Sequence, residues 1–174
     1  MKKTYLIKLV STAMFAALAC VFTIAIQIPS PMGGYINTGD GIVLTAGWLL
    51  GGGYGFLAAG VGSMLADLFT GYAHYAIGTF LIKGITALLA AWFFNSCFKL
   101  LHSKMVSRIL SGLLSELFMV VGYFFYTGLF LGKGVAAAVS IPGNLVQGFA
   151  GIVIGILITQ FLLRNKTICS LLNL

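Results

Sequence analysis

The amino-acid sequence predicts an all-α membrane protein: one domain over residues 1–174, built as a bundle of six transmembrane helices with both termini in the cytoplasm. Hydrophobic residues make up 60% of the 174 positions and charged residues only 7%, and the mean hydropathy is +1.07. Soluble domains do not combine so few charges with so much hydrophobicity. A span needs about 20 apolar residues, which leaves room for about six helices and little else. Long charge-free runs, without the alternation typical of barrels, argue against a β-barrel.

The first apolar run, residues 9–28, carries no charge and predicts the first span. Pro29 and Pro31 then end the helix, because proline has no backbone N–H to continue the hydrogen-bonding pattern. Residues 29–39 follow as an outer loop. This loop is too apolar to extend freely into solvent, so we expect it to fold back over the outer end of the bundle like a lid.

Residues 40–50 predict a second helix that is short for a full span, and residues 55–70 predict a third. The glycines at 51–53 make the turn between them. Within the third helix, small residues and one carboxylate recur at four-residue spacing, which places them on one face suited to close helix contact. They are Gly55, Ala59, Ser63 and Asp67.

Residues 75–98, 109–131 and 140–163 predict the remaining three spans. Eight of the ten Lys and Arg residues fall at the ends of apolar runs on one side of the membrane, and the positive-inside rule makes that side cytoplasmic. Lys133 falls in an outer loop and Lys83 inside a span. The net charge of +7 is therefore explained by Lys and Arg residues at the cytoplasmic ends of the spans. We expect the lipid bilayer as a partner, and no nucleic acid.

Two charged residues inside the apolar runs, Asp67 and Lys83, are the first functional candidates. A charge costs at least ~2.5–3.5 kcal/mol at the bilayer centre, so such residues usually face a partner, a cavity or a substrate. Counted at about 1.5 Å per residue, Lys83 lies roughly 12 Å below Tyr75, and polar or aromatic side chains of other spans fall in roughly the same layer. The layer predicts a polar pocket between helices, formed by Trp48, Asp67, Lys83, Tyr123, Asn144 and Gln147.

A purely structural role for these side chains is the alternative. Asp67 and Lys83 would then form an ion pair with each other, and Asn144 and Gln147 would hydrogen-bond between helices. Glu116 lies deeper, near the bilayer middle on the fifth span, and the sequence assigns it no role.

Motifs for nucleotide hydrolysis, zinc binding and nucleophilic catalysis are missing from the sequence. There is no Gly-x-x-x-x-Gly-Lys-Ser/Thr phosphate loop, no zinc-ligand spacing of His, Cys and carboxylates, and no Gly-x-Ser-x-Gly elbow. We therefore expect no enzyme, no metal and no cofactor in this chain, but a binding protein that takes its energy from something else.

Several short motifs occur in a fixed order along the chain. The earlier ones are Tyr35-Ile36-Asn37-Thr38-Gly39-Asp40 and Gly55-x-x-x-x-Gly60-x-Gly62-Ser63-x-x-x-Asp67-Leu68. The later ones are Tyr72-Ala73-x-Tyr75-Ala76, Lys83-Gly84 and Ile141-Pro142-Gly143-Asn144-Leu145-x-Gln147-Gly148. Together they resemble the substrate-binding membrane subunits (S components) of energy-coupling factor (ECF) vitamin transporters, closest to the branch for riboflavin, hydroxymethylpyrimidine or pyridoxine. The family's inner turn often carries Gly-Pro, where this chain has Gly51-Gly52-Gly53.

The resemblance implies a substrate site near the outer surface, capped by the first outer loop, and adds Asn37 and Tyr75 to the candidate substrate-binding residues. It also implies a complex with a transmembrane T component and two ATPases in the bacterial cell membrane, where those ATPases use the ATP. The family's contact with the T component is an alanine pair in the first helix, here Ala13 and Ala17. The S component is thought to topple in the membrane and carry its vitamin inward.

The combined interpretation is a high-affinity S component for pyridoxine or hydroxymethylpyrimidine, whose ring would stack on Trp48 or Tyr123. Riboflavin would need a larger pocket, and folate and pantothenate carry carboxylates that Lys83 could match. The less favoured alternatives are a small integral membrane enzyme that uses Asp67, Lys83 and Glu116, and a channel or assembly factor.

Overall fold

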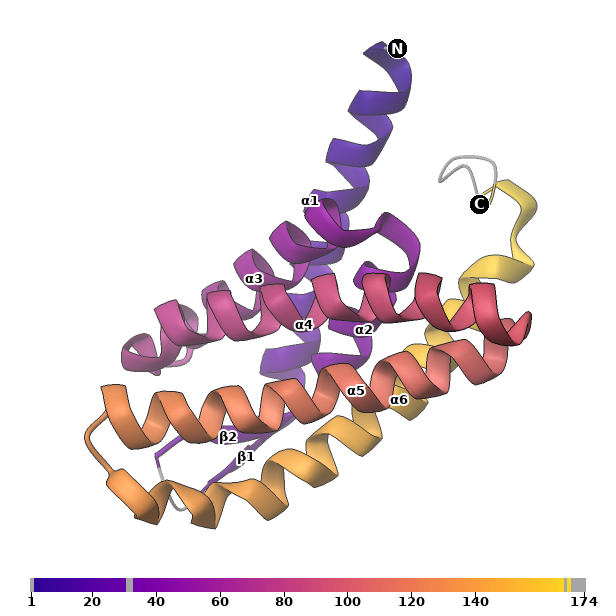
Figure 1. The fold of residues 1–174 in the computed structure, drawn as a ribbon. Helices are drawn as coiled ribbons and strands as arrows, with labels where there is room; N and C mark the ends of the chain where they lie inside the picture. The colour runs from indigo at the N-terminus through magenta and orange to yellow at the C-terminus, as the bar shows by residue number, and fades with distance from the viewer. Residues whose placement is uncertain (1, 31–32, 168, 170–174) are drawn as a thin grey trace.

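The computed structural model describes residues 2–30, 33–167 and 169, which form a bundle of six α-helices with a short β-hairpin at one end (Figure 1). The start of α1 projects beyond the bundle, and it lies toward the same side of the molecule as the end of α6. The helices are α1 (Lys2–Ala25), α2 (Asp40–Leu50), α3 (Gly52–Phe69), α4 (Ala73–Leu101), α5 (Lys104–Phe125) and α6 (Ile141–Arg164).

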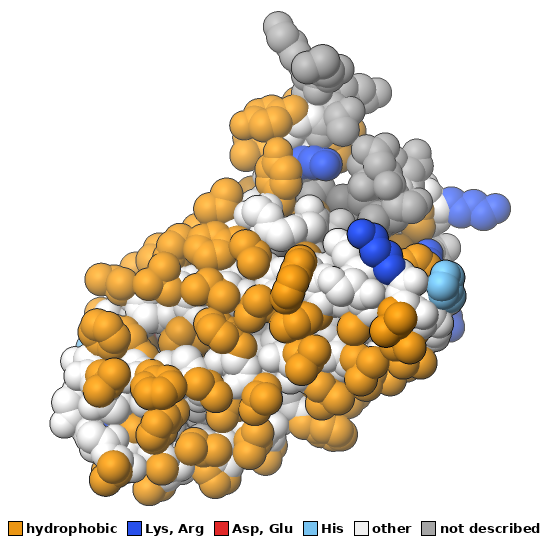
Figure 2. All heavy atoms as spheres, in the orientation of Figure 1, with side chains coloured by type: hydrophobic (Ala, Val, Ile, Leu, Met, Phe, Trp, Pro, Cys, Tyr) orange, Lys and Arg blue, Asp and Glu red, His pale blue; other side chains and the backbone are white. Residues whose placement is uncertain are grey.

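Four stretches of the described chain are long and apolar enough to cross a membrane, and α2 is a shorter apolar helix. Figure 2 shows hydrophobic side chains over the visible face of the bundle, with Lys and Arg side chains toward the end that carries the α4–α5 turn. These features agree with the predicted helical membrane bundle, whereas six full spans and cytoplasmic termini stay predictions. The four stretches are Tyr5–Ala25, Ala73–Leu101, Lys104–Phe130 and Gly134–Arg164.

A two-stranded antiparallel hairpin runs from the end of the predicted first span into the predicted outer loop, which departs from the all-α prediction. β1 (Gln27–Pro29) pairs with β2 (Tyr35–Asn37). α1 ends at Ala25, so the prediction that this helix continues to residue 28 is wrong. Strands of three residues are too short to produce an alternating hydrophobic pattern, so the sequence carries no signal for them.

The other helix boundaries differ from the predicted ones by a few residues. α3 begins at Gly52 directly after Gly51, whose positive φ of 82° suits glycine and makes the predicted turn. α5 passes into a π-helical turn at Tyr126–Phe130, and a 3-10 segment at Gly134–Ser140 leads into α6. The predicted span 109–131 therefore includes the π-helical turn but misses the first five residues of α5, and the predicted span 140–163 agrees with α6 to within one residue at each end.

Glycines let α2 sit at the centre of the bundle, where ten of its eleven residues are buried. A side-chain carbon added at Gly47 of α2 would lie 2.3 Å from the backbone oxygen of Ala87 in α4. A carbon added at Gly151 of α6 would lie 2.6 Å from the Cβ of Asp40. The backbones of α4 and α6 thus rest almost directly on α2, and Asp40 begins this helix in a fully buried position.

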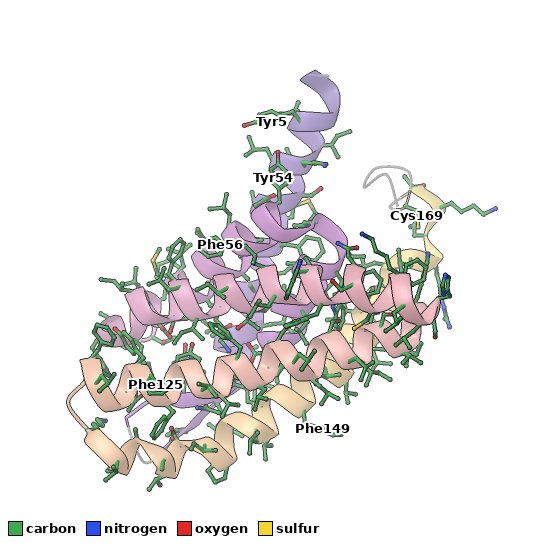
Figure 3. All side chains as sticks on the ribbon, viewed as in Figure 1. Tyr5, Tyr54, Phe56, Phe125, Phe149 and Cys169 are labelled. Atoms are coloured by element: carbon green, nitrogen blue, oxygen red, sulfur yellow. The ribbon has the colours of Figure 1, made fainter. Side chains whose placement is uncertain are left out.

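Some aromatic side chains pack between neighbouring helices, and others face the outer surface of the bundle. Phe56 of α3 packs edge to face on Phe80 of α4, with ring centroids 5.4 Å apart. Phe125 and Phe149 project outward from α5 and α6 (Figure 3) and are 53% and 69% exposed. The small-residue face predicted for α3, from Gly55 to Asp67, is buried as expected.

Candidate functional site

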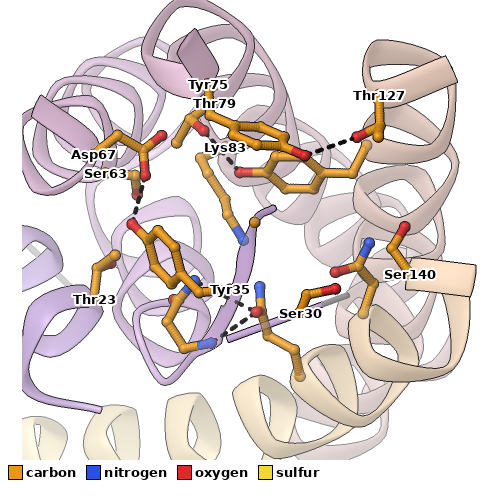
Figure 4. Close-up of a pocket in the computed structure, with 15 residues that line it drawn as sticks. Thr23, Ser30, Tyr35, Ser63, Asp67, Tyr75, Thr79, Lys83, Thr127 and Ser140 are labelled. Carbon is orange, nitrogen blue, oxygen red and sulfur yellow. Dashed lines mark hydrogen bonds between the residues drawn. The ribbon is translucent and has the colours of Figure 1, made fainter. Parts of the chain in front are cut away.

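A pocket lies beneath the hairpin, between α3, α4, α5 and α6 (Figure 4). Its free volume is about 40 Å³, enough for a few water molecules at ~10–15 Å³ each. Hydroxyl, amide and phenol side chains dominate the lining. The lining residues are Thr23, Ser30, Gly34, Tyr35, Asn37, Ser63, Asp67, Tyr75, Thr79, Lys83, Tyr123, Thr127, Ser140, Asn144 and Gln147.

Seven of the eight predicted substrate-binding residues line this pocket, although they come from five different elements. The helices therefore bring the predicted polar layer together around one cavity. A role of these side chains in substrate binding stays a prediction. The seven are Asn37, Asp67, Tyr75, Lys83, Tyr123, Asn144 and Gln147.

Lys83 forms its ion pair with Asp40, at the inner end of the pocket. The ammonium contacts Asp40 Oδ1, and the two side chains are 2% and 0% exposed. Gln147 Nε2 donates a hydrogen bond to Asp40 Oδ2 at 2.7 Å. The alternative ion pair between Asp67 and Lys83 is therefore wrong. α2 begins directly after the hairpin, and its first residue, Asp40, is buried within reach of Lys83.

The same network ties the hairpin to the base of the pocket. The backbone N–H of Asn37 donates to Gln147 Oε1 at 2.8 Å, and the side-chain oxygen of Asn37 accepts from Gly39 N–H at 2.9 Å. Gln147 thus donates to a carboxylate and accepts from the hairpin, which requires both halves of its amide. The position of β2 therefore depends on the ion pair beneath it.

Asp67 makes the second contact between the hairpin and the helices. The Tyr35 hydroxyl donates to Asp67 Oδ1 at 2.5 Å (Figure 4). Asp67 is 3% exposed. Its Oδ2 accepts no hydrogen bond of ordinary geometry from the described residues. The Thr79 hydroxyl lies close to this carboxylate and can turn to donate to it. Burial raises the pKa of the Tyr35 phenol, and the negative charge of Asp67 raises it further. Tyr35 therefore keeps its proton and remains a donor.

Tyrosines of α4 and α5 form another wall of the pocket. The Tyr123 hydroxyl donates to Thr79 Oγ1 at 3.1 Å, and the hydroxyl oxygens of Tyr75 and Thr127 lie 3.4 Å apart. Lys83 Nζ lies 5.3 Å from the centroid of the Tyr123 ring, a cation–π distance. This wall presents aromatic faces next to hydroxyl groups, an arrangement suited to a flat polar ring.

Trp48 and Glu116 lie outside the pocket lining. The Trp48 indole donates to Ser111 Oγ at 3.0 Å, and its ring packs in a hydrophobic cluster with Ile152. The predicted stacking of a ligand on Trp48 therefore has no support in this geometry, because α2 starts deeper than the sequence suggested. Glu116 is 4% exposed, and neither of its carboxyl oxygens has a hydrogen-bond partner in the described part of the chain.

Ala13 and Ala17, the predicted contact with a T component, are exposed on α1. A different face of α1 packs inside the protein, because a carbon added at Gly62 of α3 would lie 2.3 Å from the backbone oxygen of Ala16 and 2.8 Å from the Cβ of Ala19. The alanine pair therefore lies on an exposed face of α1, and its role in assembly stays a prediction.

The pocket also depends on residues that sequence reasoning left out of the candidate site. Asp40 and Tyr35 stand in the first quoted motif, so a signal for them was present. Thr79 lies four residues after Tyr75 and four before Lys83, which puts all three on one face of α4. Hydroxyl side chains alone do not stand out in an apolar span, because they bond readily to their own helix.

Comparisons with known proteins show the family and the fold of the chain. The family model described as "ECF-type riboflavin transporter, S component" matches residues 3–164. A Pyrococcus woesei protein described as "Uncharacterized protein in gap 3'region" is 36% identical over 137 residues, which cover 78% of this chain and 87% of that protein. A solved structure, "Structure and mechanism of the S component of a bacterial ECF transporter", matches with a TM-score of 0.67 and 21% identity over 90% of this chain and 95% of that chain, which shows a shared fold. The chain therefore belongs to the family of ECF-type riboflavin transporter S components, which are membrane-embedded subunits of transporters and not enzymes.

Proposed function

We propose that this chain binds a small ring-shaped polar vitamin in the pocket beneath the hairpin, with pyridoxine or hydroxymethylpyrimidine as the first candidates. The observation that carries the proposal is the meeting of seven predicted polar and aromatic residues from five elements around one cavity. Ligand sites of this type combine apolar or aromatic walls with a few directed polar groups. Tyr75 and Tyr123 would stack on the ring, and Asn144 and Asp67 would bond its substituents.

Riboflavin is the second candidate, because the matching family model carries its name. The cavity of about 40 Å³ is small beside the ~300–1,000 Å³ of typical ligand pockets. Any ligand must therefore displace the hairpin or the side chains that close the pocket, and a single-ring vitamin requires a smaller displacement than a three-ring flavin. The size of the closed pocket favours the single-ring compounds.

The transport cycle follows from the family and is part of the proposal. The exposed face of α1 with Ala13 and Ala17 would contact a T component, which is energised by two ATPases. The S component would then topple in the cell membrane and deliver its vitamin to the cytoplasm. Both termini would lie on that side, where most of the Lys and Arg residues of the chain are predicted.

The test is ligand binding by the purified protein in lipid nanodiscs. Mass spectrometry of co-purified small molecules comes first, followed by equilibrium dialysis against pyridoxine, hydroxymethylpyrimidine, riboflavin, folate and pantothenate. Micromolar or tighter binding of one vitamin is expected. Asn144→Leu should weaken it by about 5- to 160-fold, because a lost hydrogen bond in a desolvated site costs ~1–3 kcal/mol. Leu145→Ala, one position along and 50% exposed, is the matched control and should bind normally. Failure of every vitamin to bind would reject the proposal.

A further inference from the structure

We propose that the ligand carries an amino or aminomethyl group whose nitrogen donates to Asp67 Oδ2. This inference rests on the proposed function and names the chemical class within it. It follows from how the charges inside the bundle are paired, and not from the identity of any relative.

All three acidic residues of the chain lie in its interior. Asp40, Asp67 and Glu116 are 0%, 3% and 4% exposed. One ammonium, that of Lys83, lies in the pocket lining. The buried guanidinium of Arg108 lies 5.7 Å from the Phe94 ring and about two helical turns from Glu116, toward the α4–α5 turn. The region around the pocket thus holds more potential negative than positive charge.

Lys83 is already neutralised by a protein group. Its ammonium pairs with Asp40, and the second oxygen of that carboxylate accepts from Gln147. A ligand anion would have to compete with Asp40 for this ammonium, and Asp40 would then be left buried without its counter-charge. The Lys83 ammonium is therefore not available to bind the carboxylate of a vitamin.

Asp67 has the opposite character, because it forms no ion pair with the described residues. Oδ1 accepts from Tyr35 at 2.5 Å, and Oδ2 is buried with the Thr79 hydroxyl beside it and no cationic partner. In Figure 4 the Asp67 carboxyl group and the Lys83 side chain extend toward the space between Tyr35 and Tyr75. A buried acceptor of this kind is satisfied by a donor from the ligand, and a charged nitrogen is the strongest such donor.

The tyrosine wall favours the same class. Tyr75 and Tyr123 have ring centroids 6.4 Å apart, and Tyr35 and Tyr72 have centroids 4.6 Å apart. Aromatic faces attract cations through the ring quadrupole, most strongly where water is excluded. An aromatic ring with an amino or aminomethyl group would therefore meet complementary partners on both sides, whereas a carboxylate would face Asp67.

The experiment compares ligands that share a ring and differ in one substituent. Pyridoxamine, pyridoxine and 4-pyridoxic acid carry an aminomethyl, a hydroxymethyl and a carboxylate group at the same ring position. Hydroxymethylpyrimidine and its 4-oxo analogue form a second pair, and riboflavin and pantothenate complete the panel. Affinities are measured by isothermal titration of the full-length protein in nanodiscs, with wild type, Asp67→Asn and Leu68→Ala. Leu68 neighbours Asp67 on α3 and is 47% exposed, so its variant is the matched control.

In the ring series that binds, the member with the amino or aminomethyl group should bind at least about tenfold more tightly than the hydroxyl or oxo member, since charge-assisted hydrogen bonds are the stronger ones. 4-Pyridoxic acid and pantothenate should not bind, and Asp67→Asn should abolish the preference while Leu68→Ala keeps it. If Asp67→Asn does not fold, the wild-type series decides alone. Equal or tighter binding of a compound without an amino or aminomethyl group, or a preference unchanged in folded Asp67→Asn, would overturn the inference and leave vitamin binding intact. No binding by any compound would reject the proposed function itself.

Discussion

Lys83 of α4 pairs with Asp40, the first residue of α2, and not with Asp67, which is closer in the sequence. Both members of the pair are buried, and Gln147 of α6 holds the second carboxylate oxygen. The pair therefore joins three helices and, through Gln147, the hairpin. Removing this ion pair should therefore lower the stability of the fold as well as change the pocket.

Lys83→Met should lower the free energy of unfolding by ~3–5 kcal/mol, because it leaves the Asp40 carboxylate buried and unpaired. Adding Asp40→Asn should recover a large part of that loss, since the amide keeps an acceptor for Gln147 without the charge. Thermal unfolding of the single and double variants in nanodiscs measures the coupling. Lys99→Met, an exposed position on the same helix, is the control and should unfold like wild type. A double variant no more stable than Lys83→Met would contradict the role given to this pair.

Tyr35→Phe should loosen the hairpin while it keeps the ring that packs on Tyr72 at 4.6 Å. A hydrogen bond to a charged group contributes ~1.5–3 kcal/mol, so opening of the hairpin should become about 10 to 100 times more frequent. Hydrogen–deuterium exchange of a peptide that covers Tyr35–Asn37 reports this opening. Tyr54→Phe is the matched control, because Tyr54 packs near Lys8 on the far side of the bundle (Figure 3). Exchange that is equal in both variants would show that the bond does not hold the hairpin.

The Tyr35 hydroxyl should also make stability sensitive to alkaline pH. Burial and the Asp67 charge raise the pKa of the phenol in the folded protein, while a tyrosine in the unfolded chain ionises near about pH 10. A raised folded-state pKa means that the folded protein binds more protons, so this stabilisation is complete below the unfolded pKa and declines as the pH rises above it. The stability difference between wild type and Tyr35→Phe should therefore be constant between about pH 7 and 9 and shrink above about pH 10. A difference that grows with pH would contradict the assignment.

Gly47→Ala should destabilise the bundle by ~1–3 kcal/mol through overpacking. The added methyl group would lie 2.3 Å from the backbone oxygen of Ala87, so α2 and α4 would have to separate. Gly53→Ala adds the same methyl group where nothing lies within 4 Å, and it should be neutral or stabilising by up to ~1 kcal/mol. Thermal unfolding of both variants compares them directly, and equal effects would show that α2 does not depend on this contact.

Ala13→Trp combined with Ala17→Trp should prevent co-purification with a T component and leave vitamin affinity unchanged. Both positions are exposed, so the larger side chains can be accommodated without refolding. Val153→Trp combined with Leu157→Trp changes two exposed positions four residues apart on α6 and serves as the control. Pull-down of each double variant after co-expression with a T component measures assembly. Normal assembly of the α1 variant would place the interface elsewhere.

The sequence by itself determined the class of protein and much of the site. Long apolar runs can only be accommodated as membrane helices, and a few polar residues inside them mark the pocket because their burial in lipid is costly. Seven of the eight predicted binding residues accordingly meet around one cavity. The four-residue recurrence from Gly55 to Asp67 likewise predicted the buried face of α3.

Only the tertiary structure decided which charges pair and which residues stay outside the pocket. A span's length can be read along the chain, but its depth depends on where it starts, and α2 starts beneath a hairpin that leaves no periodic signal. Because α2 starts at this depth, Asp40 lies beside Lys83, and Trp48 lies outside the pocket and bonds to Ser111. Asp67 instead accepts a hydrogen bond from Tyr35, because the packing of the hairpin brings the Tyr35 hydroxyl within reach.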